Sequence, residues 1–194
     1  MKAGVLFSGG KDSSLAALML SRDYEVELNT FVFTPARTLQ GVIKAAEALG
    51  FSHRMHVFAP EILEGAVASV IACGYPNDAI NMVHRAAIGV LCRDYRVVAD
   101  GTRLDDRVPM LTRDEVQRLR DCCGCSYVRP LLGYGKPEIT RLSERLLRVQ
   151  YGETGALENG DYEGEIREAL AARGMSPEAF FPPHHMQSLV VGRA

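Results

Sequence analysis

Apolar residues in the first half of the chain fall into short runs, each ending at a glycine or another turn residue. Such runs are typical of strands that are buried on both faces of a parallel sheet. Longer segments between them have apolar positions on one side only, which predicts amphipathic helices. The predicted strands are residues 2–7, 26–33, 53–58 and 97–100, and the predicted helices are residues 12–21, 37–49, one opened by Pro60, and one from Asn77 or Asp78 to Cys92.

The second half of the chain is less regular. Helices are predicted at residues 112–121 and 137–149, on either side of an irregular segment that runs from Cys122 to Gly135. One more helix (about 161–173) and a short apolar run at residues 189–191, predicted as an edge strand, follow a stretch rich in glycine and acidic residues. Because strands and helices alternate, we expect an α/β fold with an open, mostly parallel sheet and helices on both faces.

Length and composition fit one domain with a full core, since the chain has 194 residues and 47% of them are hydrophobic. We expect residues 1–150 to form this domain and residues 151–194 to pack on it as a C-terminal extension. No apolar run approaches the roughly 20 residues that a membrane span needs, and the N-terminus leads directly into a predicted strand. We therefore expect a soluble, cytoplasmic protein that is not associated with membranes.

The net charge of −2 gives the chain no general attraction to nucleic acid. Its positive charge is mostly arginine, however, and the arginines are clustered. The clusters are either solvated helix faces or a surface for a polyanion such as RNA, because arginine binds phosphate in a bidentate manner. They are Arg103, Arg107, Arg113, Arg118 and Arg120 in one stretch, and Arg141, Arg145 and Arg148 in another.

The segment from Ser8 to Ser13, Ser-Gly-Gly-Lys-Asp-Ser, stands between the first predicted strand and the first predicted helix. Two glycines allow a sharp turn and a close approach of the backbone to a ligand. The amide groups at the start of the helix favour an anion, and the hydroxyls of Ser8 and Ser13 and the charge of Lys11 add to this. Asp12 fits such a site as a helix cap or through a magnesium ion. The segment therefore predicts a phosphate-binding loop, although its spacing is not that of a Walker A loop.

This loop resembles the Ser-Gly-Gly-x-Asp-Ser signature of the PP-loop ATP pyrophosphatase superfamily, and the resemblance extends over about residues 1–150. The resemblance implies that Ser8, Gly9, Gly10, Asp12 and Ser13 hold the β- and γ-phosphates of ATP. It also implies that the end of the second strand, at Phe31 to Phe33, meets the adenine through its backbone. In this superfamily a substrate oxygen attacks the α-phosphate, pyrophosphate leaves, and sulfur or ammonia then displaces AMP.

A second loop, Gly101 to Asp106, follows the fourth predicted strand and resembles the Gly-x-x-x-Asp-Asp element of many PP-loop enzymes. Adjacent carboxylates near a triphosphate need a compensating cation or arginine. We therefore expect Gly101 at the nucleotide and Asp105 or Asp106 at a magnesium ion, the alternative being an acidic helix N-terminus.

The five cysteines are odd in number, which argues against a disulfide framework. Three of them, Cys122, Cys123 and Cys125, precede Arg129-Pro130-Leu131, a combination similar to the tRNA thiolation branch of the superfamily, although the branch's Cys-x-x-Cys pair is absent. Cys73, Cys122 and Cys125 could hold an iron–sulfur cluster or zinc, one of the three clustered thiols could relay sulfur, or the segment could simply be packed. Cys92 is predicted to be a core residue, and Arg129 either binds phosphate or lies on the surface.

The resemblance thus implies an enzyme that adenylates a carbonyl oxygen, and we expect catalytic roles for Lys11, Asp12 and the clustered cysteines. The favoured reaction is sulfur transfer to a tRNA base, for which the partners are ATP, tRNA and a sulfur-donor protein. An amide ligase that uses ammonia and a nucleotide-binding subunit without turnover are the alternatives. We also expect a homodimer, and His184 and His185 are either zinc ligands, acid/base groups or neither.

Overall fold

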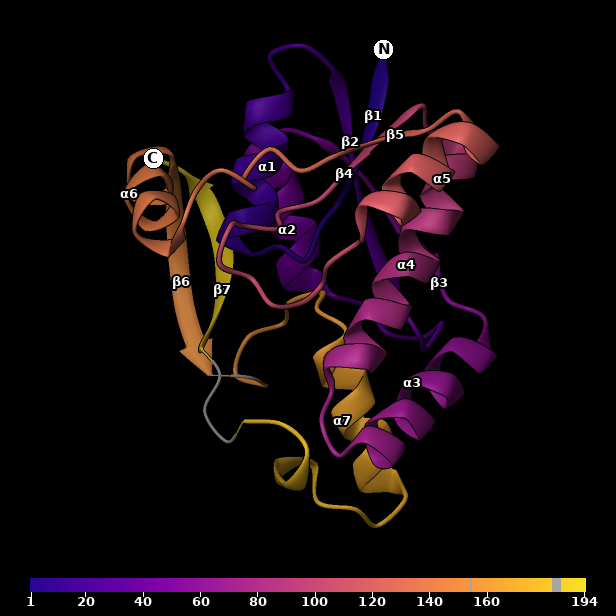
Figure 1. Cartoon of the computed structure of the whole chain (residues 1–194). Coiled ribbons are helices and arrows are strands. Elements are labelled where there is room, and N and C mark those ends of the chain that lie inside the picture. Colours follow the sequence, from indigo (N-terminus) through magenta and orange to yellow (C-terminus); the bar gives the residue numbers. More distant parts are fainter. Residues whose placement is uncertain (154, 183–185) are drawn as a thin grey trace.

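Five parallel strands form the central sheet of the computed structural model, which describes residues 1–153, 155–182 and 186–194 (Figure 1). The spatial order of the strands is β3-β2-β1-β4-β5. Their bounds are β1 Lys2–Leu6, β2 Glu25–Val32, β3 Ser52–Val57, β4 Val97–Ala99 and β5 Ser126–Val128. The predicted α/β fold is confirmed, including its open parallel sheet.

Helices cover both faces of this sheet because residues that alternate along each strand are buried against different helices. Val5 and Leu28 face a core formed with α1 and α2, whereas Leu6 and Phe31 face a core formed with α3, α4 and α7. The helices are α1 Lys11–Leu20, α2 Gln40–Leu49, α3 Pro60–Cys73, α4 Asn77–Asp94, α5 Arg113–Cys123, α6 Lys136–Leu146 and α7 Glu163–Ala172, with a short 3₁₀ helix at Pro177–Ala179.

The order of the strands places a switch point between β1 and β4. From β1 the chain extends the sheet in one direction through β2 and β3, and α3 and α4 then return it to β4 on the other side of β1. In open α/β sheets ligands bind beyond the carboxyl ends of the strands at such a point. The glycine turn follows β1 and the Gly101 loop follows β4, so the two loops predicted to bind the nucleotide meet here.

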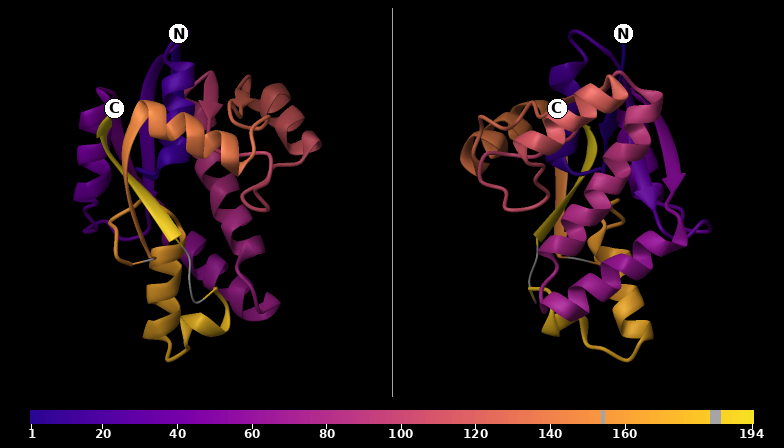
Figure 2. Two further views of the ribbon diagram at one scale, coloured as in Figure 1. Left: turned by 90° about the vertical axis from the view of Figure 1, so that its left-hand side faces the viewer. Right: turned by 45° about the vertical axis from the view of Figure 1, so that its right-hand side comes forward.

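The C-terminal part forms a separate hairpin of two antiparallel strands, β6 Leu147–Glu153 and β7 Met186–Arg193 (Figure 2). Strand β7 packs on α1 and α2, while α7 packs on α3 at the opposite face of the sheet. The proposed boundary at residue 150 falls inside β6. Among the residues whose structure is described, no helix is both long and apolar enough to cross a membrane.

Two of the predicted elements were wrong in detail. The helix predicted at residues 137–149 ends at Leu146, because the following residues pair with β7 and continue as a strand. The segment from Cys122 to Gly135 was predicted to be irregular but contains β5, a strand of only three residues. The run at residues 189–191 is indeed in a strand, but it belongs to the hairpin and not to the main sheet.

Candidate functional site

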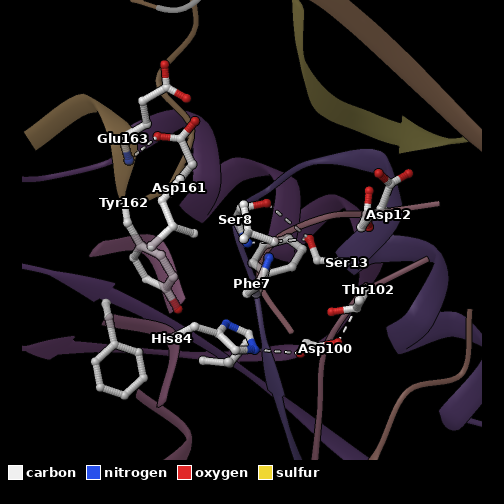
Figure 3. Close-up of a pocket in the computed structure, with 18 of the residues that line it drawn as sticks. Phe7, Ser8, Asp12, Ser13, His84, Asp100, Thr102, Asp161, Tyr162 and Glu163 are labelled. Atoms are coloured by element: carbon white, nitrogen blue, oxygen red, sulfur yellow. Dashed lines mark hydrogen bonds and ion pairs between the residues drawn. The ribbon is translucent and has the colours of Figure 1, made fainter. Parts of the chain in front are cut away.

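A cavity of about 270 Å³ opens where the carboxyl ends of β1, β2 and β4 meet (Figure 3). Four segments far apart in the sequence contribute polar side chains to its lining. These are the glycine turn with Ser8, Asp12 and Ser13, the loop after β4 with Asp100, Thr102 and Asp106, α4 with His84, and the segment before and at the start of α7 with Asp161, Tyr162 and Glu163. Figure 3 shows Asp161, Tyr162 and Glu163 on one side and, on the other, Asp12, Ser13, Asp100 and Thr102.

The glycine turn presents its serine hydroxyls to this cavity. Gly9 has a φ of 79°, a left-handed conformation that favours glycine, and Gly10 is the N-cap of α1. The hydroxyl oxygens of Ser8 and Ser13 lie 3.4 Å apart, and that of Ser13 also donates to the carbonyl of Gly10 at 3.2 Å. An anion beside Ser8 and Ser13 would therefore meet two hydroxyls and the N-terminus of α1.

Gly101 brings the loop after β4 against the same helix start. A Cβ atom at this position would lie 2.6 Å from the backbone nitrogen of Ser13 and 2.7 Å from the carbonyl carbon of Asp12. Because these are backbone atoms, neither can move aside without deforming the turn. Glycine at position 101 thus allows both predicted nucleotide loops to line one cavity.

The C-terminal segment braces the glycine turn from behind, which the sequence did not predict. The amide of Val190 donates to the carbonyl of Gly9 at 2.8 Å, and the amide of Lys11 donates to the hydroxyl of Ser188 at 3.1 Å. A Cβ atom on Gly9 would approach the side chain of Leu189 to 2.9 Å. Gly9 and Gly10 therefore face β7 and do not line the cavity, so a ligand reaches the turn from the side of Ser8 and Ser13.

The acidic residues of the two loops are compensated by basic side chains. Arg103 donates to Asp106 through its backbone amide at 2.8 Å and its Nε at 3.1 Å, and this contact raises the pKa of Arg103. Asp105 is exposed and accepts the amide of Lys136 at 3.0 Å, which lowers the pKa of Asp105. Lys11 does not line the cavity, and its ammonium group lies 2.8 Å from Asp12.

A magnesium ion at Asp105 or Asp106 stays a prediction. Arg103 approaches both carboxylates, with its Nε 3.7 Å from Oδ1 of Asp105 and its guanidinium against Asp106, and within the described ranges no three His, Cys, Asp or Glu side chains are grouped in a way that could hold a metal ion. Arg103 compensates the charge of these carboxylates, and an arginine was one of the two compensating groups that we expected, the other being a metal cation.

A buried hydrogen-bond network lines the cavity at Asp100 and His84, and no sequence motif predicted it. Asp100, directly after β4, is only 4% exposed, and it accepts hydrogen bonds from Nε2 of His84 at 2.7 Å, from the amide of Thr102 at 2.9 Å and from the hydroxyl of Tyr127. Burial opposes the charge of Asp100, but these donors outweigh it and lower the pKa of Asp100. Burial, together with the charge of Asp100, raises the pKa of Tyr127.

The end of β2 does not offer free amide groups to an adenine. Phe31 lines the cavity and stacks on Phe58, whereas Phe33 lies outside the cavity lining. The amides of Phe33 and Thr34 both donate to the carboxylate of Glu165 on α7, at 3.0 and 2.9 Å. The expected backbone contact at Phe33 is thus already made by a buried glutamate from the C-terminal segment.

The cysteines are not gathered into one site. Cys73 ends α3 just before α4 begins, whereas Cys125 lies 2.7 Å, between sulfur atoms, from Cys92 near the other end of α4. The start of α4, next to Cys73, and Cys92 are about 22 Å apart along the helix, at about 1.5 Å per residue. Cys73 and Cys125 therefore cannot share an iron–sulfur cluster or a zinc ion, and the predicted metal site is wrong.

The remaining thiols also lie away from the cavity. Cys122 and Cys123 are exposed at the end of α5, where they line a shallow groove with Arg85 and Leu119. Cys92 is buried, as predicted, and its hydrogen bond with Cys125 and its burial raise its pKa. None of the five cysteines lines the cavity beside the glycine turn.

Arg129 also falls outside the cavity lining. The guanidinium of Arg129 packs over the ring of Tyr127, with 5.6 Å from Cζ to the ring centroid, and it contacts the sulfur of Met110 at 3.1 Å. Arg129 thus contacts Tyr127, a member of the Asp100 network, but does not itself line the cavity. His184 and His185 lie outside the described residues.

Comparison with known proteins identifies the family. Residues 1–192 match DUF7411, a family of unknown function. The chain belongs to this family. An uncharacterized protein of Methanocaldococcus jannaschii is 39% identical over 193 residues, which are 99% of this chain and 96% of that protein.

Solved structures include one relative that matches the whole chain. The crystal structure of a predicted subunit of tRNA methyltransferase from Methanocaldococcus jannaschii has a TM-score of 0.91 and 38% identity, covering 100% of this chain and 98% of that one. The NH3-dependent NAD synthetase of Campylobacter jejuni is similar at a lower level, with a TM-score of 0.49 and 15% identity over 74% of this chain and 62% of that one.

Proposed function

We propose that this DUF7411 protein uses ATP to adenylate a carbonyl oxygen of its substrate, forming pyrophosphate. The observation that supports this is the meeting of Ser8, Ser13 and Gly101 at the switch point between β1 and β4. The β- and γ-phosphates lie beside the two serine hydroxyls and the start of α1, and the α-phosphate points into the cavity. The resemblance of residues 8–13 to the PP-loop signature supports the same assignment.

The proposed substrate is a base in tRNA. This part of the proposal is supported by the whole-length relative described as a predicted subunit of tRNA methyltransferase, which is 38% identical. Many bases carry a lactam, a ring carbonyl next to a ring N–H, whose oxygen can attack the α-phosphate. Activation of this oxygen prepares the ring carbon for a nucleophile, which then displaces AMP.

The position of the cysteines bears on which nucleophile is used. Because no cysteine lines the cavity, the sulfur of a thiolation reaction has to come from a separate donor protein or from a small molecule. The same observation favours ammonia as the second candidate, since ammonia needs no protein thiol. The two differ in the product: one substrate gains a sulfur atom, the other a nitrogen atom.

The test of ATP use is binding and product formation with defined variants. We expect the wild type to bind ATP in titration calorimetry and to release pyrophosphate when bulk tRNA is added. Ser13→Ala and Asp12→Ala should abolish pyrophosphate release without unfolding the chain. Ser21→Ala, at the opposite and exposed end of the same helix, is the matched control and should behave like the wild type. Unchanged release in Ser13→Ala would contradict the assignment.

A further inference from the structure

His84 and Asp100 form a buried pair that lines the same cavity as the glycine turn and the Gly101 loop. His84 is 3% exposed on α4, and its Nε2 lies 2.7 Å from Oδ2 of Asp100. Nδ1, the other ring nitrogen, has no hydrogen-bond partner within the described part of the chain. In Figure 3 it is turned away from Asp100 and toward the space between Phe7 and Tyr162.

The network fixes which nitrogen of His84 carries the proton. The lowered pKa of Asp100 keeps its carboxylate ionised, and an ionised carboxylate only accepts hydrogen bonds. Nε2 must therefore donate its N–H to Asp100, and in the neutral ring Nδ1 is left with a free lone pair. A histidine that served only to compensate Asp100 would not need this second nitrogen to face a cavity.

The same cavity holds the hydroxyls of the glycine turn. Ser8, Ser13 and His84 all line it, and Gly101 fixes the loop that begins at Asp100 against the start of α1. The ring of Tyr162 flanks His84 edge-on, with 6.3 Å between ring centroids. His84 is thus held rigidly by Asp100 at a fixed place relative to the turn, as a proton-transfer group requires.

We propose that His84 is a catalytic base, whose Nδ1 accepts the N–H proton of a lactam while the lactam oxygen is adenylated. This inference rests on the proposed function. The oxygen forms a bond to the α-phosphorus, and the bond between that phosphorus and the bridging oxygen breaks. Pyrophosphate leaves with the electron pair, the proton moves to Nδ1, and a neutral O-adenylated imidate remains. Asp100 and Tyr127 are positioning residues in this step, because they hold the ring and its tautomer.

Other titratable groups surround His84 and must be considered in any pH profile. Asp100 after β4, Tyr127 on β5 and Tyr162 before α7 contact the ring, and burial followed by the charge of Asp100 raises the pKa of Tyr162. The carboxylates that line other parts of the cavity are Asp12, Asp106, Asp161 and Glu163. A pH dependence of the rate can therefore be assigned to His84 only if it disappears in His84→Gln.

Nitrogen NMR of the histidine rings tests the inference without turnover. In its neutral form we expect one ring with a protonated Nε2 and a bare Nδ1, and its signals should vanish in His84→Gln. Adding uridine, which has the lactam N–H, should move this Nδ1 resonance, whereas 3-methyluridine, which lacks that N–H, should not. A protonated Nδ1 with a bare Nε2, or an Nδ1 signal that uridine leaves unmoved, would overturn the proposal.

Kinetics provide the second test. His84→Gln should bind ATP within about threefold of the wild type but release pyrophosphate about 10²- to 10⁴-fold more slowly. The wild-type rate should rise as the imidazole loses its proton, and this rise should be absent in His84→Gln. Equal rates in the two proteins would reject His84 as the base. If the wild type bound no ATP, the proposed function would fail, while the NMR experiment would still decide the tautomer of His84 and whether its Nδ1 meets a lactam N–H.

Discussion

Glu165 Oε2 accepts the backbone amide of Phe33 at 3.0 Å, although the two residues are 132 positions apart in the sequence. Glu165 Oε1 does the same for the neighbouring amide of Thr34, and the glutamate is 6% exposed. The carboxylate of Glu165 thus covers the end of β2. The resemblance to PP-loop enzymes placed the adenine at this same end. An adenine can use the Phe33 amide only if Glu165 moves away.

This contact predicts opposite effects of Glu165→Ala on stability and on affinity. The variant leaves two amides without their partner, which should lower the free energy of unfolding by about 1–3 kcal/mol. It also removes a competitor of the adenine, so ATP should bind more tightly than to the wild type in calorimetry. Glu168→Ala, an exposed glutamate on the same helix, is the control and should change neither quantity. Weaker ATP binding in Glu165→Ala would mean that the adenine does not use this amide.

The close approach of Gly101 to α1 gives a second prediction. In Gly101→Ala the new methyl group would meet the backbone of Asp12 and Ser13, so the loop after β4 must move away from the glycine turn. We expect ATP binding to fall by at least tenfold and the melting temperature to drop by several degrees. Gly133→Ala is the matched control, because a Cβ atom there has no neighbour within 4 Å and its φ is not left-handed. Wild-type ATP affinity in Gly101→Ala would remove this loop from the site.

The sequence was sufficient for the fold and for one side of the site. Apolar runs gave the first four strands, and the turn residues after β1 and β4 lie together because parallel strands end at one edge of the sheet. Contacts between residues far apart in the sequence leave no local sequence pattern, and for this reason they were not predicted. Nothing around His84 marks its partner as Asp100, and Ser188 stands in an ordinary hairpin strand although its hydroxyl accepts the amide of Lys11.

The cysteine cluster shows the opposite error, in which a local pattern suggested chemistry that the fold does not assemble. Cys122, Cys123 and Cys125 are close in sequence, but α5 ends between them at Gly124 and sends their side chains into different surroundings. Cys125 becomes part of the core beside Cys92, while its two neighbours remain exposed. Spacing along the chain could not reveal this because it depends on where the helix ends.

The stability of the protein should depend on pH through Asp100. Its pKa is lowered in the folded state, so the ionised network contributes stability above the unfolded pKa of about 3.9 and loses it as the pH falls through the folded value. Asp100→Asn should therefore lower the free energy of unfolding at pH 7 by about 1–3 kcal/mol. The difference from the wild type should shrink below about pH 4, as measured by urea unfolding across pH. A difference that stays constant down to pH 2 would show that the charge of Asp100 is not involved.

The exposed thiols of α5 provide the test of a sulfur relay within this chain. Because Cys122 and Cys123 do not line the cavity, the double variant Cys122→Ser, Cys123→Ser should keep wild-type ATP binding and AMP formation, within about twofold. Cys73→Ser, an exposed cysteine at the end of α3, is the control for the loss of a surface thiol. If the double variant still adenylates its substrate but no longer yields a thiolated product in mass spectrometry, sulfur passes through α5. If it yields the same product as the wild type, the nucleophile does not pass through Cys122 or Cys123, as we expect because neither lines the cavity.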